Sequence, residues 1–171
     1  MPLSWNEQIN QHLLRLWKDN PSAIAVIVGV GNEMMGDDAA GMLVVQKLKI
    51  SLPADSLIRV VEGGPAPENC TGTLRQLKPG LVIFVDAGNF NAKPGSIALF
   101  TGDEAEGISA FGHTLPLHVL GKYIESELGC QSLLLLIQPE GIEYDRKVSD
   151  PVLRAVETLV KKLSGILTRA D

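Results

Sequence analysis

The chain has 171 residues, a formal net charge of −5, 45% hydrophobic residues and 20% charged residues, which is typical of one globular domain with a sizeable core. The acidic balance and the lack of a basic cluster argue against nucleic-acid or anionic-membrane partners, and no apolar run approaches the roughly 18 residues of a membrane span. The polar start lacks the apolar block of a signal peptide, and Cys70 and Cys130 suggest neither a disulfide framework nor a metal site, so a soluble cytoplasmic protein is predicted.

The first 20 residues predict a helical extension. Ser4 to Glu7 has the pattern of a capping box, and Ile9, Leu13 and Leu16 recur on one side of the following helix. Asn20-Pro21 ends this helix. We expect residues 1–171 to form one domain, with residues 1–20 added to its front.

The rest of the chain alternates predicted strands with predicted helices, which is typical of a three-layer α/β/α fold. The strand of residues 96–100 follows its predecessor without a crossover helix, so it is expected to be antiparallel in a mostly parallel, five-stranded sheet. The apolar stripe of the last helix is expected at Leu153, Val156, Val160 and Leu163. Strands are predicted over 23–30, 57–61, 81–85, 96–100 and 132–137, and helices over 38–48, 68–77 and 117–128, with a last helix that opens at Asp150-Pro151.

The turn after the first predicted strand combines glycines with two acids. In an open α/β sheet this turn lies at the carboxyl end of a strand, where ligands bind. The segment from Gly29 to Gly31 suggests a dinucleotide motif, but Met34 stands where the third glycine is required. Asp37 and Asp38 would repel a pyrophosphate, so a cation or a proton is the expected ligand.

Acids and a histidine from three segments could meet at this edge. Asp37 and Asp38 follow the first strand, Asp86 follows the third, and His113 precedes the helix near Leu115. Two carboxylates and an imidazole suit a borderline divalent metal and leave coordination positions open. The absence of cysteine from this set argues against a closed structural zinc site.

Each of these residues also has a structural interpretation. Asp37 could cap the helix that follows it, and Asp38 could be a first-turn acid that complements the helix dipole. Asp86 could form a turn, and an isolated histidine such as His113 is more often structural or solvated.

Five stretches in order resemble the hydrogenase maturation proteases, which are the endopeptidases that trim the C-terminus of nickel-iron hydrogenase large subunits. The similarity is greatest to the hydrogenase 3 type and covers about residues 23 to 165. The N-terminal helix lies outside the usual pattern. The stretches are Gly29–Gly41, Glu62–Asn69, Val85–Ala87, His113–Leu117 and Ile137–Pro139.

The resemblance implies a role for each acid. It assigns metal contact and catalysis to Asp38, Asp86 and His113, and leaves Asp37 as a neighbouring acid that is not a ligand. Because asparagine caps helices about as well as aspartate, and because the resemblance places the metal contact at Asp38, Asp37→Asn is expected to be mild by comparison with Asp38→Asn. The resemblance also implies a hydrogenase large-subunit precursor as the protein substrate, nickel supplied by that precursor, and a monomeric enzyme.

Two alternatives from other functional classes stay open on the sequence. One is a non-catalytic checkpoint protein that binds the nickel-loaded precursor and cleaves nothing. The other is a small nucleotide-binding oxidoreductase. The loop at Gly63-Gly64 could supply backbone donors near the bond to be cut, or it could be an ordinary tight turn.

Overall fold

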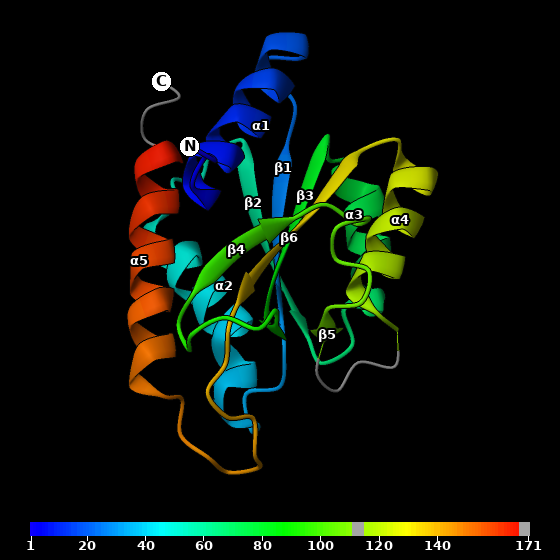
Figure 1. Ribbon diagram of the computed structural model, residues 1–171. Coiled ribbons are helices and arrows are strands. Elements are labelled where there is room, and N and C mark those ends of the chain that lie inside the picture. The colour runs from blue at the N-terminus through cyan, green and yellow to red at the C-terminus, as the bar shows by residue number, and fades with distance from the viewer. Residues whose placement is uncertain (111–114, 168–171) are drawn as a thin grey trace.

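Figure 1 shows the computed structural model, which describes residues 1–110 and 115–167. Helices and strands alternate along most of the chain, and η marks a short 3-10 helix. In chain order the elements are α1 (Trp5–Asp19), β1 (Ala25–Val30), η1 (Gly36–Ala39), α2 (Ala40–Ser51), β2 (Ile58–Gly64), η2 (Pro67–Cys70), α3 (Thr71–Leu77), β3 (Leu81–Asn89), β4 (Ile97–Phe100), β5 (Ser109–Ala110), α4 (Leu117–Leu128), β6 (Gln131–Ile137) and α5 (Asp150–Leu167).

Five strands form the main sheet in the order β2-β1-β3-β6-β4. The pairs β1–β2, β1–β3 and β3–β6 are parallel, whereas β4 runs antiparallel to β6. The two-residue strand β5 pairs with the end of β3 and was not anticipated from the sequence. The predicted mostly parallel five-stranded sheet with one antiparallel strand is therefore confirmed.

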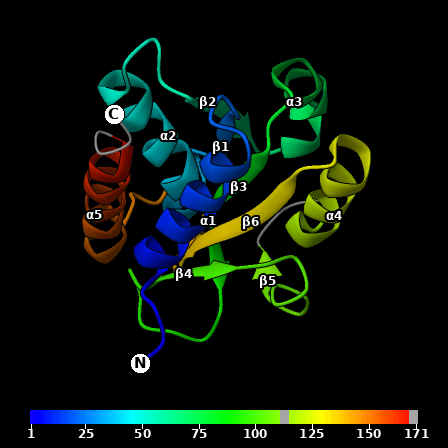
Figure 2. The same cartoon turned by 90° about the horizontal axis from the view of Figure 1, so that it is seen from above.

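The central strands are buried on both faces, which explains their uninterrupted apolar sequences. Every residue of β1 is buried, and so are the first eight residues of β3. Alternate residues face opposite sides of the sheet. Ile27 and Ile83 contribute to the core beneath α1, α2 and α5, while Val28 and Phe84 contribute to the core beneath α3 and α4. Figure 2 shows these two helical layers on either side of the sheet.

The N-terminal helix is part of the core rather than a loose appendage. Ile9 and Leu13 are 0% and 1% exposed and pack in the same cluster as α2 and α5. The indole of Trp17 donates to the Ala23 carbonyl oxygen at 3.1 Å, which ties the end of α1 to the start of β1. In Figure 1, α1 lies at the upper end of the molecule, whereas the loop of residues 138–149 lies at the lower end.

We expect Leu13→Ala to lower the free energy of unfolding by about 2–5 kcal/mol, because it removes a buried side chain from a filled core. Leu14→Ala is the matched control, since Leu14 is 59% exposed on the same helix. Urea titration of both variants measures the difference. Equal stability of the two variants would show that α1 does not contribute to the folded core.

Two sequence expectations about helices are wrong in detail. The apolar stripe of α5 is formed by Val152, Ala155, Val156, Leu159 and Leu163, while Leu153 is 39% exposed. The helix expected from residue 38 begins at Ala40, because the two acids belong to the 3-10 turn η1.

Across the described residues, no helix is long and apolar enough to cross a membrane.

Candidate active site

The carboxyl ends of β1 and β3 bring two of the predicted site acids to one edge of the sheet. Gly29 pairs with Val85, so Asp86 lies one residue further along β3, level with the end of β1. Asp38 lies in η1, which follows β1 and packs against β3. Both acids therefore lie at the same edge of the sheet, Asp86 within β3 and Asp38 in the 3-10 turn that follows β1.

Asp86 is an acid inside a buried strand. It was expected to follow the third strand, but β3 continues past it to Asn89, so that position in the prediction was wrong. The side chain is 0% exposed, and its Oδ1 accepts the Ala87 N–H at 2.8 Å. Because Val82 and Phe84 face the α3 and α4 layer, the two-residue period of the strand turns Asp86 toward that layer as well.

Asp38 is almost as deeply buried, with 5% of its surface exposed. Its Oδ2 accepts the Asn32 N–H at 2.8 Å, which directs the carboxylate back over the end of β1. A buried carboxylate is costly unless charge or hydrogen bonds compensate it. Two buried acids at one edge of an otherwise apolar sheet are therefore chemically unusual.

The glycines of this segment serve close packing of α2 on the sheet. A Cβ on Gly29 would lie 2.3 Å from a methyl of Val45, and one on Gly31 would lie 1.8 Å from the Asp38 carbonyl oxygen. A Cβ on Gly41 would lie 2.1 Å from the Val85 carbonyl oxygen. The absence of side chains at these positions lets the turn that carries Asp38 settle directly on the strand ends. This packing accounts for the glycines without a phosphate.

Asp37 does not cap a helix, so the structural interpretation suggested by the sequence is wrong. It is 0% exposed, and its carboxylate accepts hydrogen bonds from the loop of residues 138–149. Its Oδ2 accepts the Glu140 and Gly141 N–H groups at 2.7 and 3.1 Å. The N–H and hydroxyl of Ser149 donate to Oδ1 and Oδ2 at 2.7 and 2.9 Å.

His113 lies outside the described residues, between β5 and α4, so its predicted place beside the two acids stays a prediction. In the part of the chain that the structure describes, no group of three His, Cys, Asp or Glu side chains is placed to hold a metal ion. Burial raises the pKa of the Cys70 and Cys130 thiols. Both cysteines therefore favour the protonated form, which is a poor metal ligand.

One polar residue at this edge received no role from the sequence. Gln138 follows β6 and is 8% exposed. Its Oε1 accepts the Phe90 and Ala92 N–H groups, and its Nε2 donates to Asn89 Oδ1. These bonds fasten the segment after β3 to the end of β6. The sequence signal for this residue was an amide directly after the buried apolar run that ends at Ile137.

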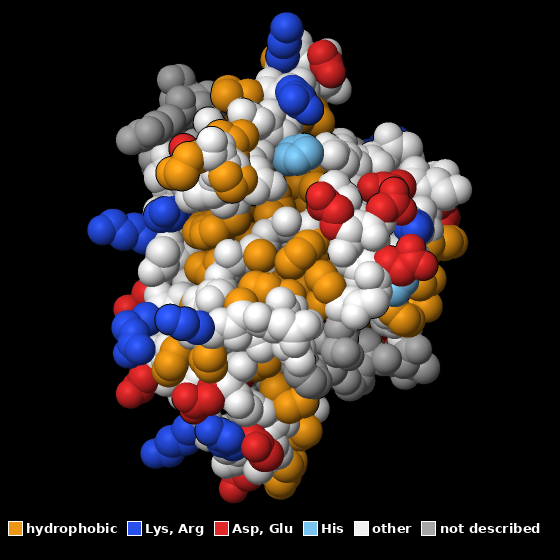
Figure 3. Space-filling model, viewed as in Figure 1, with side chains coloured by type: hydrophobic (Ala, Val, Ile, Leu, Met, Phe, Trp, Pro, Cys, Tyr) orange, Lys and Arg blue, Asp and Glu red, His pale blue; other side chains and the backbone are white. Residues whose placement is uncertain are grey.

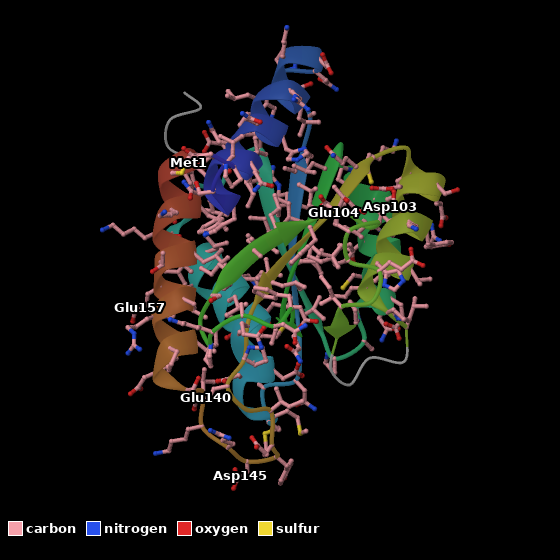
Figure 4. The ribbon with its side chains drawn as sticks, viewed as in Figure 1. Met1, Asp103, Glu104, Glu140, Asp145 and Glu157 are labelled. Carbon is pink, nitrogen blue, oxygen red and sulfur yellow. The ribbon has the colours of Figure 1, made fainter. Side chains whose placement is uncertain are left out.

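The loop of residues 138–149 itself carries several charged side chains. Arg146 bridges Glu140 and Glu143 at 3.0 and 2.9 Å, and the bond to Glu143 raises the pKa of the guanidinium. Figure 4 places Glu140 and Asp145 at the lower end of the molecule. Figure 3 shows acidic, basic and hydrophobic side chains together there.

The fold is that of endopeptidases that mature hydrogenases. The crystal structure of the [NiFe] hydrogenase maturation protease HycI from Thermococcus kodakarensis KOD1 superposes with a TM-score of 0.78 at 30% identity, over 85% of this chain and 93% of that one. The solution structure of the endopeptidase HycI from Escherichia coli gives a TM-score of 0.73 at 31% identity, over 83% of this chain and 90% of that one.

The chain belongs to the hydrogenase maturation protease family. The family model described as HycI, hydrogenase maturation protease, matches residues 42–166. The hydrogenase 3 maturation protease of Escherichia coli K12 is 35% identical over 141 residues, which cover 82% of this chain and 88% of that protein. The resemblance noted in the sequence is confirmed, and the class of activity is that of a peptidase in hydrogenase maturation.

Proposed function

We propose that this protein is a nickel-dependent endopeptidase that removes the C-terminal extension of a nickel-iron hydrogenase large-subunit precursor. The observation that supports this most directly is the pair of buried carboxylates at one edge of the sheet, Asp86 in β3 and Asp38 in the turn after the neighbouring strand β1. In the proposal, His113 is the third member of the site. The enzyme acts as a monomer in the cytoplasm, and its substrate docks with the nickel centre at this edge of the sheet.

The chemistry of the donor set fits nickel that arrives with the substrate. Carboxylate oxygens and an imidazole nitrogen are suitable ligands for a divalent first-row ion, and three of them leave positions for groups from the precursor. Ligand type alone does not select nickel over copper or zinc. Asp38, Asp86 and His113 therefore recognise a metal that the precursor has already selected, and free metal binds them only modestly.

In the proposed reaction the buried acids perform two tasks. Together with His113 they hold the nickel-bearing part of the precursor so that the scissile peptide lies at the strand ends. Nickel held there by Asp38, Asp86 and His113 would supply polarisation of the scissile carbonyl or a lowered pKa of a nearby water. One of the two carboxylates takes the proton of the attacking water as general base. The turn at Gly63-Gly64, where β2 ends beside β1, lies at the same edge.

The proposal predicts that cleavage requires nickel already loaded into the precursor. Purified enzyme is incubated with nickel-loaded precursor, and separately with nickel-free precursor plus free nickel under conditions in which the precursor cannot load it. Mass spectrometry detects loss of the C-terminal extension. We expect cleavage only of the loaded precursor, and purified enzyme that carries well below one metal ion per chain.

Each of the other outcomes has a definite meaning. Efficient cleavage of nickel-free precursor with free nickel, or one tightly held metal per isolated enzyme, would show an ordinary metalloprotease with its own catalytic ion. Binding of loaded precursor without shortening would show a non-catalytic checkpoint protein. Tight binding of a dinucleotide at the β1 turn would favour the oxidoreductase alternative.

A further inference from the structure

We propose that Asp37 is a positioning residue that holds the turn carrying Asp38 in its working geometry. The inference rests on the proposed function, because it concerns the same cleavage reaction. It assigns a task to an acid for which the sequence pattern suggested only a helix cap and to which the family resemblance gave no role. Asp37 touches neither substrate nor metal in this account, and acts only through the position of its neighbour.

The carboxylate of Asp37 is saturated by hydrogen bonds from one distant segment. Four donors meet its two oxygens: three backbone N–H groups, of Glu140, Gly141 and Ser149, and the Ser149 hydroxyl. The side chain is completely buried. Since the N–H groups belong to the backbone, they fix the course of the loop itself rather than the ends of mobile side chains.

Main-chain contacts join the same two segments. The Asp37 N–H donates to the Gly141 carbonyl oxygen at 2.9 Å, and the Asp145 N–H donates to the Met34 carbonyl oxygen at 2.9 Å. A Cβ on Gly36 would lie 2.8 Å from the Gly141 oxygen, which shows how closely the loop lies on the turn. The segment of residues 34–37 therefore contacts the loop at Met34, Gly36 and Asp37.

Asp37 and Asp38 are consecutive residues of one four-residue 3-10 turn, Gly36–Ala39. One carboxylate is bound to the loop of residues 138–149, and the other accepts the Asn32 N–H beyond β1. The turn is thus held from both sides. If the loop side is released, the turn can rotate, and the carboxylate of Asp38 moves with it.

Both side-chain oxygens of Asp37 must accept hydrogen bonds in this arrangement. A carboxylate presents acceptors alone, whereas a side-chain amide replaces one oxygen with an NH2 group that has two donors. In Asp37→Asn, this NH2 group faces N–H donors whichever way the amide is turned. The expectation that Asp37→Asn is mild rested in part on helix capping, a role that Asp37 does not have in the structure.

The test compares Asp37→Asn with Leu13→Ala, which destabilises the fold from the opposite end of the molecule. Both are assayed on nickel-loaded precursor at a temperature at which circular dichroism shows them fully folded. Misplacement of a catalytic group by about 1 Å costs about 100-fold in rate. We therefore expect kcat of Asp37→Asn to fall about 10- to 100-fold with KM nearly unchanged, and Leu13→Ala to keep the kcat of the wild type.

A purely structural role for Asp37 would lower the melting temperature and leave kcat of the folded protein at the wild-type level, which overturns the inference. If Asp37→Asn does not fold, Ser149→Ala replaces it, because it removes one of the four donors. It should lower kcat a few-fold without changing KM, and a wild-type kcat would again overturn the inference. Failure of the wild type to cleave loaded precursor would instead refute the proposed function.

Discussion

Asp38→Asn is expected to abolish cleavage of the nickel-loaded precursor while the protein remains folded. Asparagine has nearly the volume of aspartate, so the substitution leaves no cavity beneath the turn that carries residue 38. The negative charge offered to the metal, however, is lost. Loss of a general base or of charge at the reacting centre costs about 10²- to 10⁴-fold in rate. Asp86→Asn and His113→Ala are expected to have the same effect. Precursor cleavage and thermal melting of each variant should be measured together.

Asp103→Asn is a suitable control for these three variants. Asp103 is an exposed residue of the loop before β5, and its carboxylate pairs with the Lys122 ammonium at 2.9 Å. Figure 4 places it well above the lower end of the molecule, where Glu140 and Asp145 lie. The Asp103→Asn variant should cleave precursor at the wild-type rate. Normal cleavage by any of the three site variants would remove that residue from the mechanism. Unfolding of a variant would instead favour a structural role for the residue concerned.

Gly41→Ala is expected to have the largest effect on folding. The new Cβ would lie 2.1 Å from the Val85 carbonyl oxygen and 2.4 Å from the Val30 carbonyl oxygen. Overpacking commonly costs about 1–3 kcal/mol. Here the obstructing atoms are backbone atoms of the two central strands and cannot swing aside. We therefore expect a loss of about 4 kcal/mol or more, which is among the largest effects of single substitutions.

The matched control is Gly72→Ala in α3, where a Cβ would meet nothing within 4 Å. Because alanine is less flexible than glycine in the unfolded chain, this change should raise stability by about 0.4–1 kcal/mol. Chemical denaturation of the two variants gives the comparison. Wild-type stability in Gly41→Ala would mean that α2 does not approach β1 and β3 as closely as the structure shows.

Most of the fold could be predicted because its elements follow local rules. Continuous apolar runs mark the buried strands, and the missing crossover helix before β4 marks the antiparallel strand. The face of α5 was misjudged because helical periodicity defines a stripe only to within one residue. Val152 and Leu159 complete the buried face, whereas Leu153 turns to solvent.

The candidate site was only partly predictable. Asp38 and Asp86 could be paired from sequence, because parallel strands end at the same edge. The role of Asp37 could not, since its hydrogen-bond donors lie 103 to 112 residues further along the chain and three of them are backbone groups. Backbone donors leave no trace in residue identity. Asp37 consequently looked like a helix cap.

The long separation between Asp37 and its donors also bears on when the protein becomes competent during synthesis. At about 5–20 residues per second, the ribosome reaches Ser149 on the order of ten seconds after Asp37. By then Asp38, Asp86 and all the strands of the main sheet have already been made. The bonds that fasten the acidic turn can therefore form only after every strand of the main sheet has been synthesised. A growing polypeptide carries Asp38 well before the loop of residues 138–149 can hold its turn in place.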